Sequence, residues 1–246
     1  IKSGLDKWNA LPFSERQISR DFKPKVRHRW ENSYPGQGMV FNLSKIDLFT
    51  DPPVQSGRSD RWNIDHVWFN KDEARLWFPK DPQEGDFYEL PDLLTDRLFC
   101  FHLVDNTRGQ TLPFAPQEIK ESNIQIEVQI RRQTSVQIKI TGHSKAVSKG
   151  LWLLGENDWT PNYELNHGIE TNLLGQATYN LGLEKFTEFE MVAIGKRNGK
   201  TKYNGRQNSP DTGYVGFLFT LAENKPSDRI APAFVDVYNA DWIIQP

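Results

Sequence analysis

The strongest constraint on the fold is a two-residue alternation of apolar and polar side chains in the middle of the chain. Between residues 124 and 131 every second residue is Ile or Val, and the residues between them are Gln, Glu or Arg. The pattern resumes over residues 136–141 after a polar segment at 132–135. Because successive side chains of a strand point to opposite faces, the sequence predicts a β-hairpin with one buried face and one solvated face.

A second hairpin is predicted from the same pattern further along the chain. Its strands are expected over residues 169–179 and 183–194, joined by a turn at Asn180–Gly182. In the second strand, Phe186, Val192 and Ile194 are expected to share one face. Shorter strands, separated by clusters of Gly, Pro, Asn and Asp, are predicted at residues 26–30, 39–41, 66–69, 98–104, 214–221 and 233–238.

Helical patterns in this sequence are short. They are expected over residues 15–20 after Ser14, in a turn or two after Asn70 or Asp72, and over residues 117–121 after Pro116. Parallel sheets need long crossover helices, which are missing from this pattern. We therefore predict a mostly β fold, an antiparallel β-sandwich or β-barrel with a few short helices, in one domain spanning residues 1–246. Residues 1–23 are expected to form an irregular N-terminal arm.

Charge and composition exclude several classes of partner and site. Thirty Lys and Arg against 32 Asp and Glu give a net charge of -2, which argues against bulk attraction to nucleic acid. No apolar run approaches the ~20 residues of a membrane span. The single cysteine, Cys100, excludes an intrachain disulfide and a multi-cysteine metal site. Its neighbours Phe99 and Phe101 predict a buried, unreactive thiol.

A secreted or periplasmic location is expected from two features of the sequence. The chain begins at Ile1 rather than Met, as after removal of a signal peptide, although a trimmed chain would begin in the same way. An Asn-Leu-Ser sequon at Asn42 agrees with export.

Two histidines stand in segments rich in aromatic residues. Strand alternation places Ile64, His66 and Trp68 on one face of their strand, and His102 on an apolar face of the strand expected at residues 98–104. Each is either a core histidine satisfied by a hydrogen bond or half of an acid–base pair. In the second case the protein is a hydrolase, lyase or isomerase, and a carboxylate orients the pair; the catalytic candidates are His66, His102, Asp65 and Asp105.

Metal and cofactor sites have little support in the sequence. A copper site through Cys100, two histidines and a methionine is disfavoured because these residues do not come from one tight loop. Zinc held by His66, His102 and a carboxylate is compatible with their spacing but is not required by it. Neither a nucleophile elbow nor a glycine-rich phosphate loop is present, so no metal and no cofactor is expected.

Tryptophans beside amides and carboxylates give the leading functional hypothesis. The chain has eight tryptophans, and those expected in loops lie beside polar residues that can bind sugar hydroxyls while the indole stacks on the ring. The predicted function is an exported, non-catalytic recognition module for a saccharide or polysaccharide. The predicted ligand-binding residues are Trp62, Asn63, Arg108, Asp158 and Trp159.

Two basic segments interrupt the balanced charge. One contains Lys25, Arg27 and Arg29 on one face of an expected strand. The other is a loop without acidic residues that contains Lys196, Arg197, Lys200, Lys202 and Arg206. They are either a charged edge strand and a solvated hairpin tip, or a patch that binds an anionic glycan if they meet in space.

Four stretches resemble a group of uncharacterised secreted proteins of planctomycete-type bacteria. They are Asp65-His-Val-Trp68, Phe101-His-Leu-Val-Asp-Asn-Thr-Arg-Gly109, Leu173-Leu-Gly175 with Tyr179, and Val192-Ala-Ile-Gly195, within residues 60–222. In that group a Glu follows the Asn-Thr-Arg-Gly stretch, whereas this chain has Gln110. The resemblance implies export, and it implies no activity.

Overall fold

The computed structural model describes residues 2–16, 29–48, 62–109, 111–151, 164–199, 204–206, 209–238 and 241–244. By contacts the chain divides into two units, one ending at Arg29 and one spanning Trp30–Gln245. In the first unit, α1 (Lys2–Ala10) and the 3₁₀ turn η1 (Phe13–Arg16) bury no residue. Residues 2–10 of the predicted irregular arm are therefore helical.

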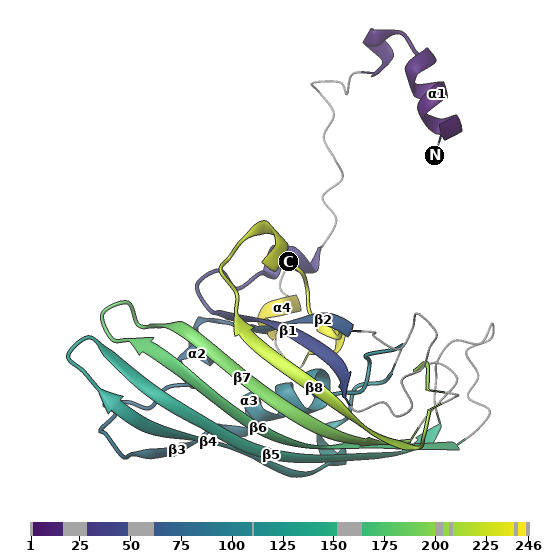
Figure 1. Cartoon of the computed structure of the whole chain (residues 1–246). Coiled ribbons are helices and arrows are strands. Elements are labelled where there is room, and N and C mark those ends of the chain that lie inside the picture. Colours follow the sequence, from purple (N-terminus) through teal and green to yellow (C-terminus); the bar gives the residue numbers. More distant parts are fainter. Residues whose placement is uncertain are drawn as a thin grey trace. The chain divides into compact units, whose positions relative to one another are not determined.

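The second unit is built on one eight-stranded antiparallel sheet (Figure 1). Its strand order is β2-β1-β8-β7-β6-β5-β4-β3, so β2 and β3 are the two edges. The mostly β class is confirmed, and the sheet is open rather than a closed barrel. The strands are β1 (Met39–Leu48), β2 (Trp62–Phe69), β3 (Phe87–Glu89), β4 (Ile119–Arg131), β5 (Ser135–Leu151), β6 (Glu164–Asn180), β7 (Lys185–Asn198) and β8 (Thr212–Leu221).

Both predicted hairpins are present, as β4–β5 and β6–β7. Each contains a register shift that changes which residues are buried. In β7 one extra residue, Thr187, lies between the pairs Tyr179–Phe186 and Thr178–Glu188. Phe186, Met191 and Ala193 are consequently buried, whereas Val192 and Ile194 are 43% and 50% exposed. The prediction that Val192 and Ile194 share a face with Phe186 is wrong, because a bulge reverses the alternation.

The helical segment at residues 92–102 packs against one face of the sheet. The sheet curls around α3 (Asp92–Arg97), which continues into the π-helical turn η3 (Leu98–His102) (Figure 1). The predicted strand at residues 98–104 is wrong. Leu94 and Leu98, four residues apart, are fully buried, as is Leu103 just after the π-helical turn. A short apolar run without alternation fits a buried helix as well as a strand.

Short helices lie at several of the predicted places. The expected turn after Asn70 is confirmed as α2 (Lys71–Arg75), where the Asn70 side chain and Glu73 form a capping box. Pro116 opens η4 (Pro116–Glu118), but strand β4 begins at Ile119. The strand predicted at residues 233–238 is wrong, because the 3₁₀ turn η6 (Val235–Val237) lies there. The remaining short helices are η2 (Trp30–Ser33), η5 (Pro226–Asp228) and α4 (Asp241–Ile244).

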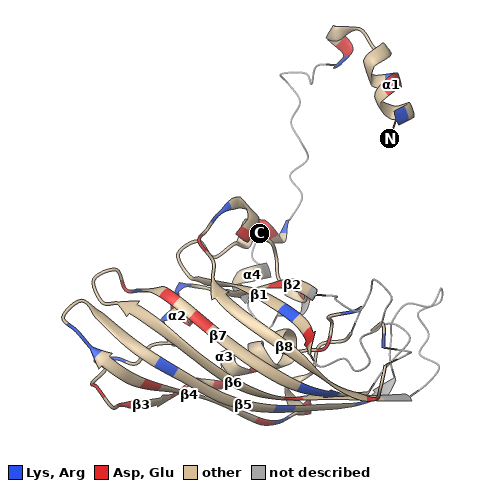
Figure 2. Ribbon diagram, in the orientation of Figure 1, with Lys and Arg blue, Asp and Glu red and all other residues tan. Residues whose placement is uncertain are grey.

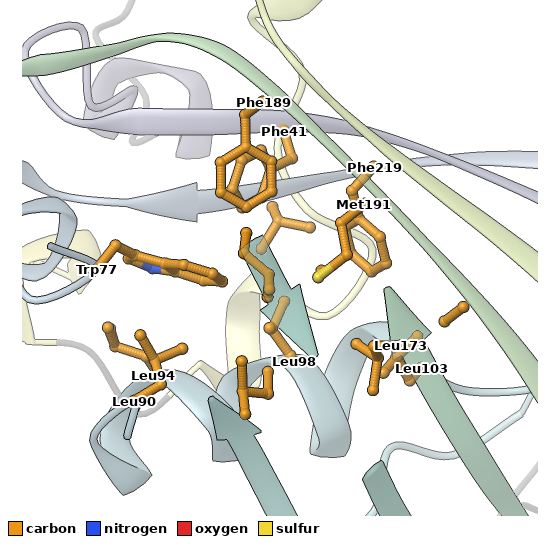
Figure 3. Close-up of a cluster of buried hydrophobic side chains, with 14 of the residues drawn as sticks. Phe41, Trp77, Leu90, Leu94, Leu98, Leu103, Leu173, Phe189, Met191 and Phe219 are labelled. Atoms are coloured by element: carbon orange, nitrogen blue, oxygen red, sulfur yellow. The ribbon is translucent and has the colours of Figure 1, made fainter. Parts of the chain in front are cut away.

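The main core lies between α3 and the face of the sheet that we call the covered face. Figure 3 shows Leu94 and Leu98 from the helical layer beside Trp77, Phe189 and Met191. Phe41 of β1 is at the centre of the aromatic packing, with the rings of Phe69, Trp77, Phe189 and Phe219 within 6.2 Å of its own. We call the opposite side of the sheet the open face. At its β1–β2 end a smaller core covers it, made of Val40, Trp68, Val235, Tyr238 and Ile243.

Candidate functional site

A group of buried charges, which we call the ion cluster, lies where β1, β7 and two loops meet. Arg206 donates to both carboxylate oxygens of Asp47, at 2.8 and 2.6 Å, and also to Asp105. Arg108 pairs with the same Asp47, and Arg197 lies 3.6 Å from Asp105. Three guanidinium groups and two carboxylates give the ion cluster a net charge of +1. It fastens the loops at residues 103–109 and 204–206 to the sheet.

The local backbone explains how Arg206 reaches this position. Gly205 has a φ of +67° and lies against the backbone of Arg108, where a Cβ atom would come within 2.8 Å of the Arg108 carbonyl oxygen. Only glycine suits that conformation and that distance. Burial alone would lower the pKa of Arg206, but hydrogen bonds to Asp105 and Asp47 raise it above its ordinary value. Arg206 is therefore held as a cation in the interior.

A second buried chain of contacts runs beside the ion cluster. Lys45 donates to Oδ1 of Asn106 at 3.0 Å and lies 3.5 Å from Oδ2 of Asp65. The same Asp65 oxygen lies 3.0 Å from Nδ1 of His102, whose Nε2 contacts the hydroxyl of Tyr238. Both ring nitrogens of His102 are thus occupied within the protein, and the side chain has no exposed surface.

The ionisation of this chain follows from burial and its partners. Burial lowers the pKa of His102, although Asp65 opposes the shift. Burial also raises the pKa of Tyr238 well above its ordinary value. A neutral Tyr238 hydroxyl therefore donates to Nε2, and Nδ1–H of His102 donates to Asp65. Burial alone would raise the pKa of Asp65, but His102 and Lys45 hold it well below its ordinary value.

The structure brings together two of the four catalytic candidates. Asp65 and His102 are hydrogen-bonded, whereas Asp105 belongs to the ion cluster. His66 is only 4% exposed, and as the residue after Asp65 its side chain points to the opposite face of β2. Burial lowers the pKa of His66 as well. In this arrangement His66 and His102 do not meet over a common reacting atom.

Two of the predicted sugar-binding residues, Asn63 and Arg108, are held by contacts within the protein rather than exposed on loops. Asn63 donates to the carbonyl oxygen of Asn106 at 3.1 Å, and the Arg108 side chain is only 10% exposed in its ion pair with Asp47. Both stabilise the loop at residues 103–109 rather than face solvent. Asp158 and Trp159 lie outside the described residues, as does the side chain of Trp62.

Of the predicted anionic-glycan patch, the structure describes Arg29, Lys196, Arg197 and Arg206. Lys25, Arg27, Lys200 and Lys202 lie outside the described residues, and Arg29 belongs to the first unit. Lys196 is exposed, but Arg197 is 4% exposed and joins the ion cluster. The assignment of Arg197 and Arg206 to a surface patch is therefore wrong. Asp105 and the carbonyl oxygen of Pro210 hold the guanidinium of Arg197, and Arg206 is 1% exposed in the ion cluster.

Several buried polar residues were not identified from the sequence. Arg97 donates at 2.6 Å to each carboxylate oxygen of Glu73, and Lys45, Arg206 and Tyr238 lie in the networks above. Lys45 was detectable, because Phe41 and Leu43 precede it at the same alternating positions. The contacts of Arg206 and Tyr238 join distant segments and have no local pattern.

A concave region on the open face, which we call the sheet hollow, is the site best suited to an external ligand. It has a volume of ≈ 860 Å³. Its polar lining comes from outward-facing positions of β5, β6 and β7, namely Gln137, Lys139, Gln176, Thr178, Glu188 and Glu190. Ile130, Leu174 and Val192 supply apolar surface at its border. Figure 2 shows acidic residues on β7 in this region.

The cross-strand register sets the geometry of the sheet hollow. Thr178 pairs with both Gln137 and Glu188, and Gln176 pairs with both Lys139 and Glu190. The six polar side chains therefore form two rows of three, about 5 Å apart across strands and about 7 Å apart along them. Amide and carboxylate groups in this arrangement donate and accept hydrogen bonds within an area comparable with one or two sugar rings.

The described part of the chain offers little support for a metal site, a reactive thiol or an exposed glycosylation site. Within it, no three His, Cys, Asp or Glu residues gather as metal ligands. Cys100 is buried, and burial raises its pKa to about 12, which confirms the unreactive thiol. Asn42 of the sequon is half-buried within β1, and its side chain bonds Asp228.

No helix among the described residues has the length and apolar character that crossing a membrane requires. Comparison with protein-family models, curated proteins and solved structures finds no match. The function must therefore be argued from the geometry of the sheet hollow.

Proposed function

We propose that this protein is an exported, non-catalytic recognition module that binds a saccharide or polysaccharide in the sheet hollow. The observation that carries the proposal is the double row of amide, hydroxyl and carboxylate side chains along a concave surface. Sugar hydroxyls both donate and accept hydrogen bonds, so a lining that offers both kinds of group suits them. The aliphatic border formed by Leu174 and Val192 matches the apolar C–H faces of a sugar ring.

The ionic character of the lining favours a neutral saccharide over an anionic one. Glu188 and Glu190 outnumber Lys139, and Lys139 has an acidic neighbour in Glu127, at 4.0 Å. A carboxylated or sulfated chain would meet a net negative surface here. The buried state of Arg197 also removes one cation from the region to which such a chain was expected to bind.

Binding without catalysis agrees with the state of the histidines. His102 has both nitrogens occupied and no exposed surface, and His66 is directed to the other face of β2. General acid–base catalysis needs a titrating group within hydrogen-bond reach of the substrate. Neither of the two histidines lines the sheet hollow, whose titratable groups are Lys139, Glu188 and Glu190.

Affinity electrophoresis of the purified chain through gels containing xylan, β-glucan, mannan or a sulfated polysaccharide tests the proposal. We expect retardation by at least one neutral polysaccharide. The double variant Gln137→Ala/Gln176→Ala should weaken binding about thirtyfold, because each of the two lost hydrogen bonds costs about 1 kcal/mol. The matched control, Gln117→Ala, removes an exposed amide outside the sheet hollow and should leave retardation unchanged.

The same experiment separates the sheet hollow from the loop tryptophans. If Trp159→Ala or Trp62→Ala abolishes retardation while the glutamine double variant binds normally, the ligand sits on the loops and the sheet hollow is not its site. If no polysaccharide retards the wild-type chain, the saccharide proposal fails.

A further inference from the structure

The open face carries a continuous apolar area next to the sheet hollow, which we call the apolar patch. It comprises Ile46, Ile64, Leu174, Val192, Ile194, Tyr214 and Leu218, which are 38–54% exposed. Ile64 and Leu218 both pair with Ser44, Leu218 pairs with Val192, and Val192 pairs with Leu174. One row of side chains therefore runs across five strands, from β2 to β6.

A second row lies beside the first and completes the apolar patch. Ile46 and Ile194 both pair with Gly216. The side chain of Leu48 lies over Gly216, where a Cβ atom would come within 3.2 Å of it. The lack of a side chain at Gly216 thus lets Leu48 fill the space between Ile46 and Ile194. The two rows form a largely apolar surface, interrupted by the exposed Ser44 between Ile64 and Leu218, rather than scattered exposed residues.

Such a surface is unusual for the solvent side of an antiparallel sheet. One face of such a sheet normally packs on the core, and the other carries polar residues. Single exposed apolar residues need no explanation, but a contiguous group marks an interaction surface. The apolar patch is therefore expected to be covered by a partner.

The order of charges along β7 identifies the partner. The outward-facing residues of β7 are, in sequence, Glu188, Glu190, Val192, Ile194 and Lys196. Acidic residues thus precede the apolar pair and a basic residue follows it. A two-fold axis crossing β7 between Val192 and Ile194 would place Glu190 of one copy opposite Lys196 of the other, and would place the apolar rows against each other.

We propose that two copies of this chain pack face to face through the apolar patch. Their β7 strands lie antiparallel across a two-fold axis, with Glu190 of each copy paired with Lys196 of the other. Two-fold interfaces require a surface complementary to itself, and an acidic–apolar–basic order meets that requirement. Stacked sheets keep their strands roughly aligned at a separation of about 10 Å, which the aliphatic side chains of the apolar patch fill.

A partner of another sequence is less well supported by the same observations. Such a partner would need an apolar surface with a basic residue facing Glu190 and an acidic residue facing Lys196. A second copy of this chain, turned by the two-fold axis, already presents that surface. The apolar patch borders the sheet hollow at Leu174, Val192 and Glu190. Of the residues substituted below, only Glu190 lines it, whereas Ile194, Leu218 and Lys196 do not. The variants at Ile194, Leu218 and Lys196 therefore let self-association and saccharide binding fail separately.

Sedimentation velocity of the full chain over 1–100 µM protein measures the association. We expect a species of twice the chain mass. Ile194→Glu and Leu218→Glu each place a carboxylate in the centre of the apolar patch and should weaken the dimer at least about a hundredfold. Val147→Glu is the matched control, because Val147 is 39% exposed on the sheet but outside the apolar patch.

Charge reversal tests the orientation. Lys196→Glu alone and Glu190→Lys alone should each weaken the dimer about tenfold by placing like charges opposite each other. The double variant Glu190→Lys/Lys196→Glu should restore most of the affinity. Glu190 and Lys196 are both exposed, so the charge-reversal variants remain informative even if Ile194→Glu and Leu218→Glu prevent folding. Far-ultraviolet circular dichroism checks the fold of each protein.

Three results would overturn the proposal. The first is that the wild-type chain sediments as a monomer at 100 µM. The second is that it dimerises but neither Ile194→Glu nor Leu218→Glu weakens the dimer. The third is that the double charge-reversal variant associates no better than the single variants. The first two results exclude this surface, and the third excludes the antiparallel arrangement of the two β7 strands.

Discussion

The two faces of the sheet are made from the same strands, yet they have different environments. On the covered face Phe41, Met191 and Phe219 are fully buried beneath the helical layer of α3 and η3. On the open face the neighbouring residues Val192 and Leu218 are 43% and 38% exposed although they are as apolar. Hydrophobic character therefore does not decide burial along these strands. The element packed over each face decides it.

Charged residues show the same contrast between the two faces. The covered face contains Lys45 and Asp65 among apolar residues, each with partners that compensate for the loss of water. The open face carries Glu188, Glu190 and Lys196, all exposed. Buried charges hold particular segments in place at a high energetic cost, whereas exposed charges are free to recognise a partner.

The largest expected difference between the faces concerns side-chain truncation. Phe41→Ala should lower the free energy of unfolding by about 4 kcal/mol, because it leaves a cavity among four aromatic rings. Val147→Ala on the open face should change it by less than about 0.5 kcal/mol. Urea unfolding followed by tryptophan fluorescence measures both. Equal effects would show that the open face is covered to the same extent as the core.

Ion pairs in the two environments should differ by a smaller amount. Arg97→Met leaves the buried carboxylate of Glu73 without its cation and should cost about 3 kcal/mol. Arg75→Met breaks the exposed pair with Glu184 and should cost less than about 1 kcal/mol. The double variant Glu73→Gln/Arg97→Met should recover part of the loss. If Arg97→Met is as mild as Arg75→Met, the pair is solvated.

The free energy of unfolding should depend on pH through His167, a buried histidine of the covered face. Burial lowers the pKa of His167 from its ordinary 6.5 to about 4, so the folded state resists its protonation. Stability should be complete above pH 6.5 and fall below it, by about 2 kcal/mol between pH 6.5 and pH 5. Urea unfolding at these two pH values measures the loss.

The variant His167→Gln should make this loss smaller without abolishing it, because burial also lowers the pKa of His66 and of His102. Asp65, whose pKa is held low, contributes stability that is lost only when the pH falls below 3.8. A wild-type profile that is flat between pH 6.5 and pH 5 would contradict the buried state of His167.

The sequence predicted those elements whose pattern is local. The alternation at residues 124–141 identified β4 and β5, and Asn70 with Glu73 supplied a local capping signal for α2. The strand prediction at residues 98–104 is wrong because the apolar run there has neither the two-residue period of a strand nor the 3.6-residue period of a helix. Its state depends on packing against the sheet, which no local pattern encodes.

The candidate site was less predictable than the fold. The sequence predicts a His66–His102 pair oriented by Asp65 or Asp105, and of these only Asp65 and His102 meet. Their further partners, Lys45 and Tyr238, come from distant segments. The sheet hollow and the apolar patch depend on the bulge at Thr187, which sends Val192 and Ile194 to the open face. A single inserted residue reverses the alternation without changing the composition of the strand.

The sequence by itself determined that the chain is mostly antiparallel β-structure, because alternation and turn residues act between near neighbours. Only the tertiary structure decided which face of each strand is covered, which charges are buried together and where a ligand or a second copy can dock. Those properties depend on contacts between segments far apart in the chain, such as Asp47 with Arg206 and His102 with Tyr238. Their free energies arise from burial and desolvation, which exist only once the segments have been brought together.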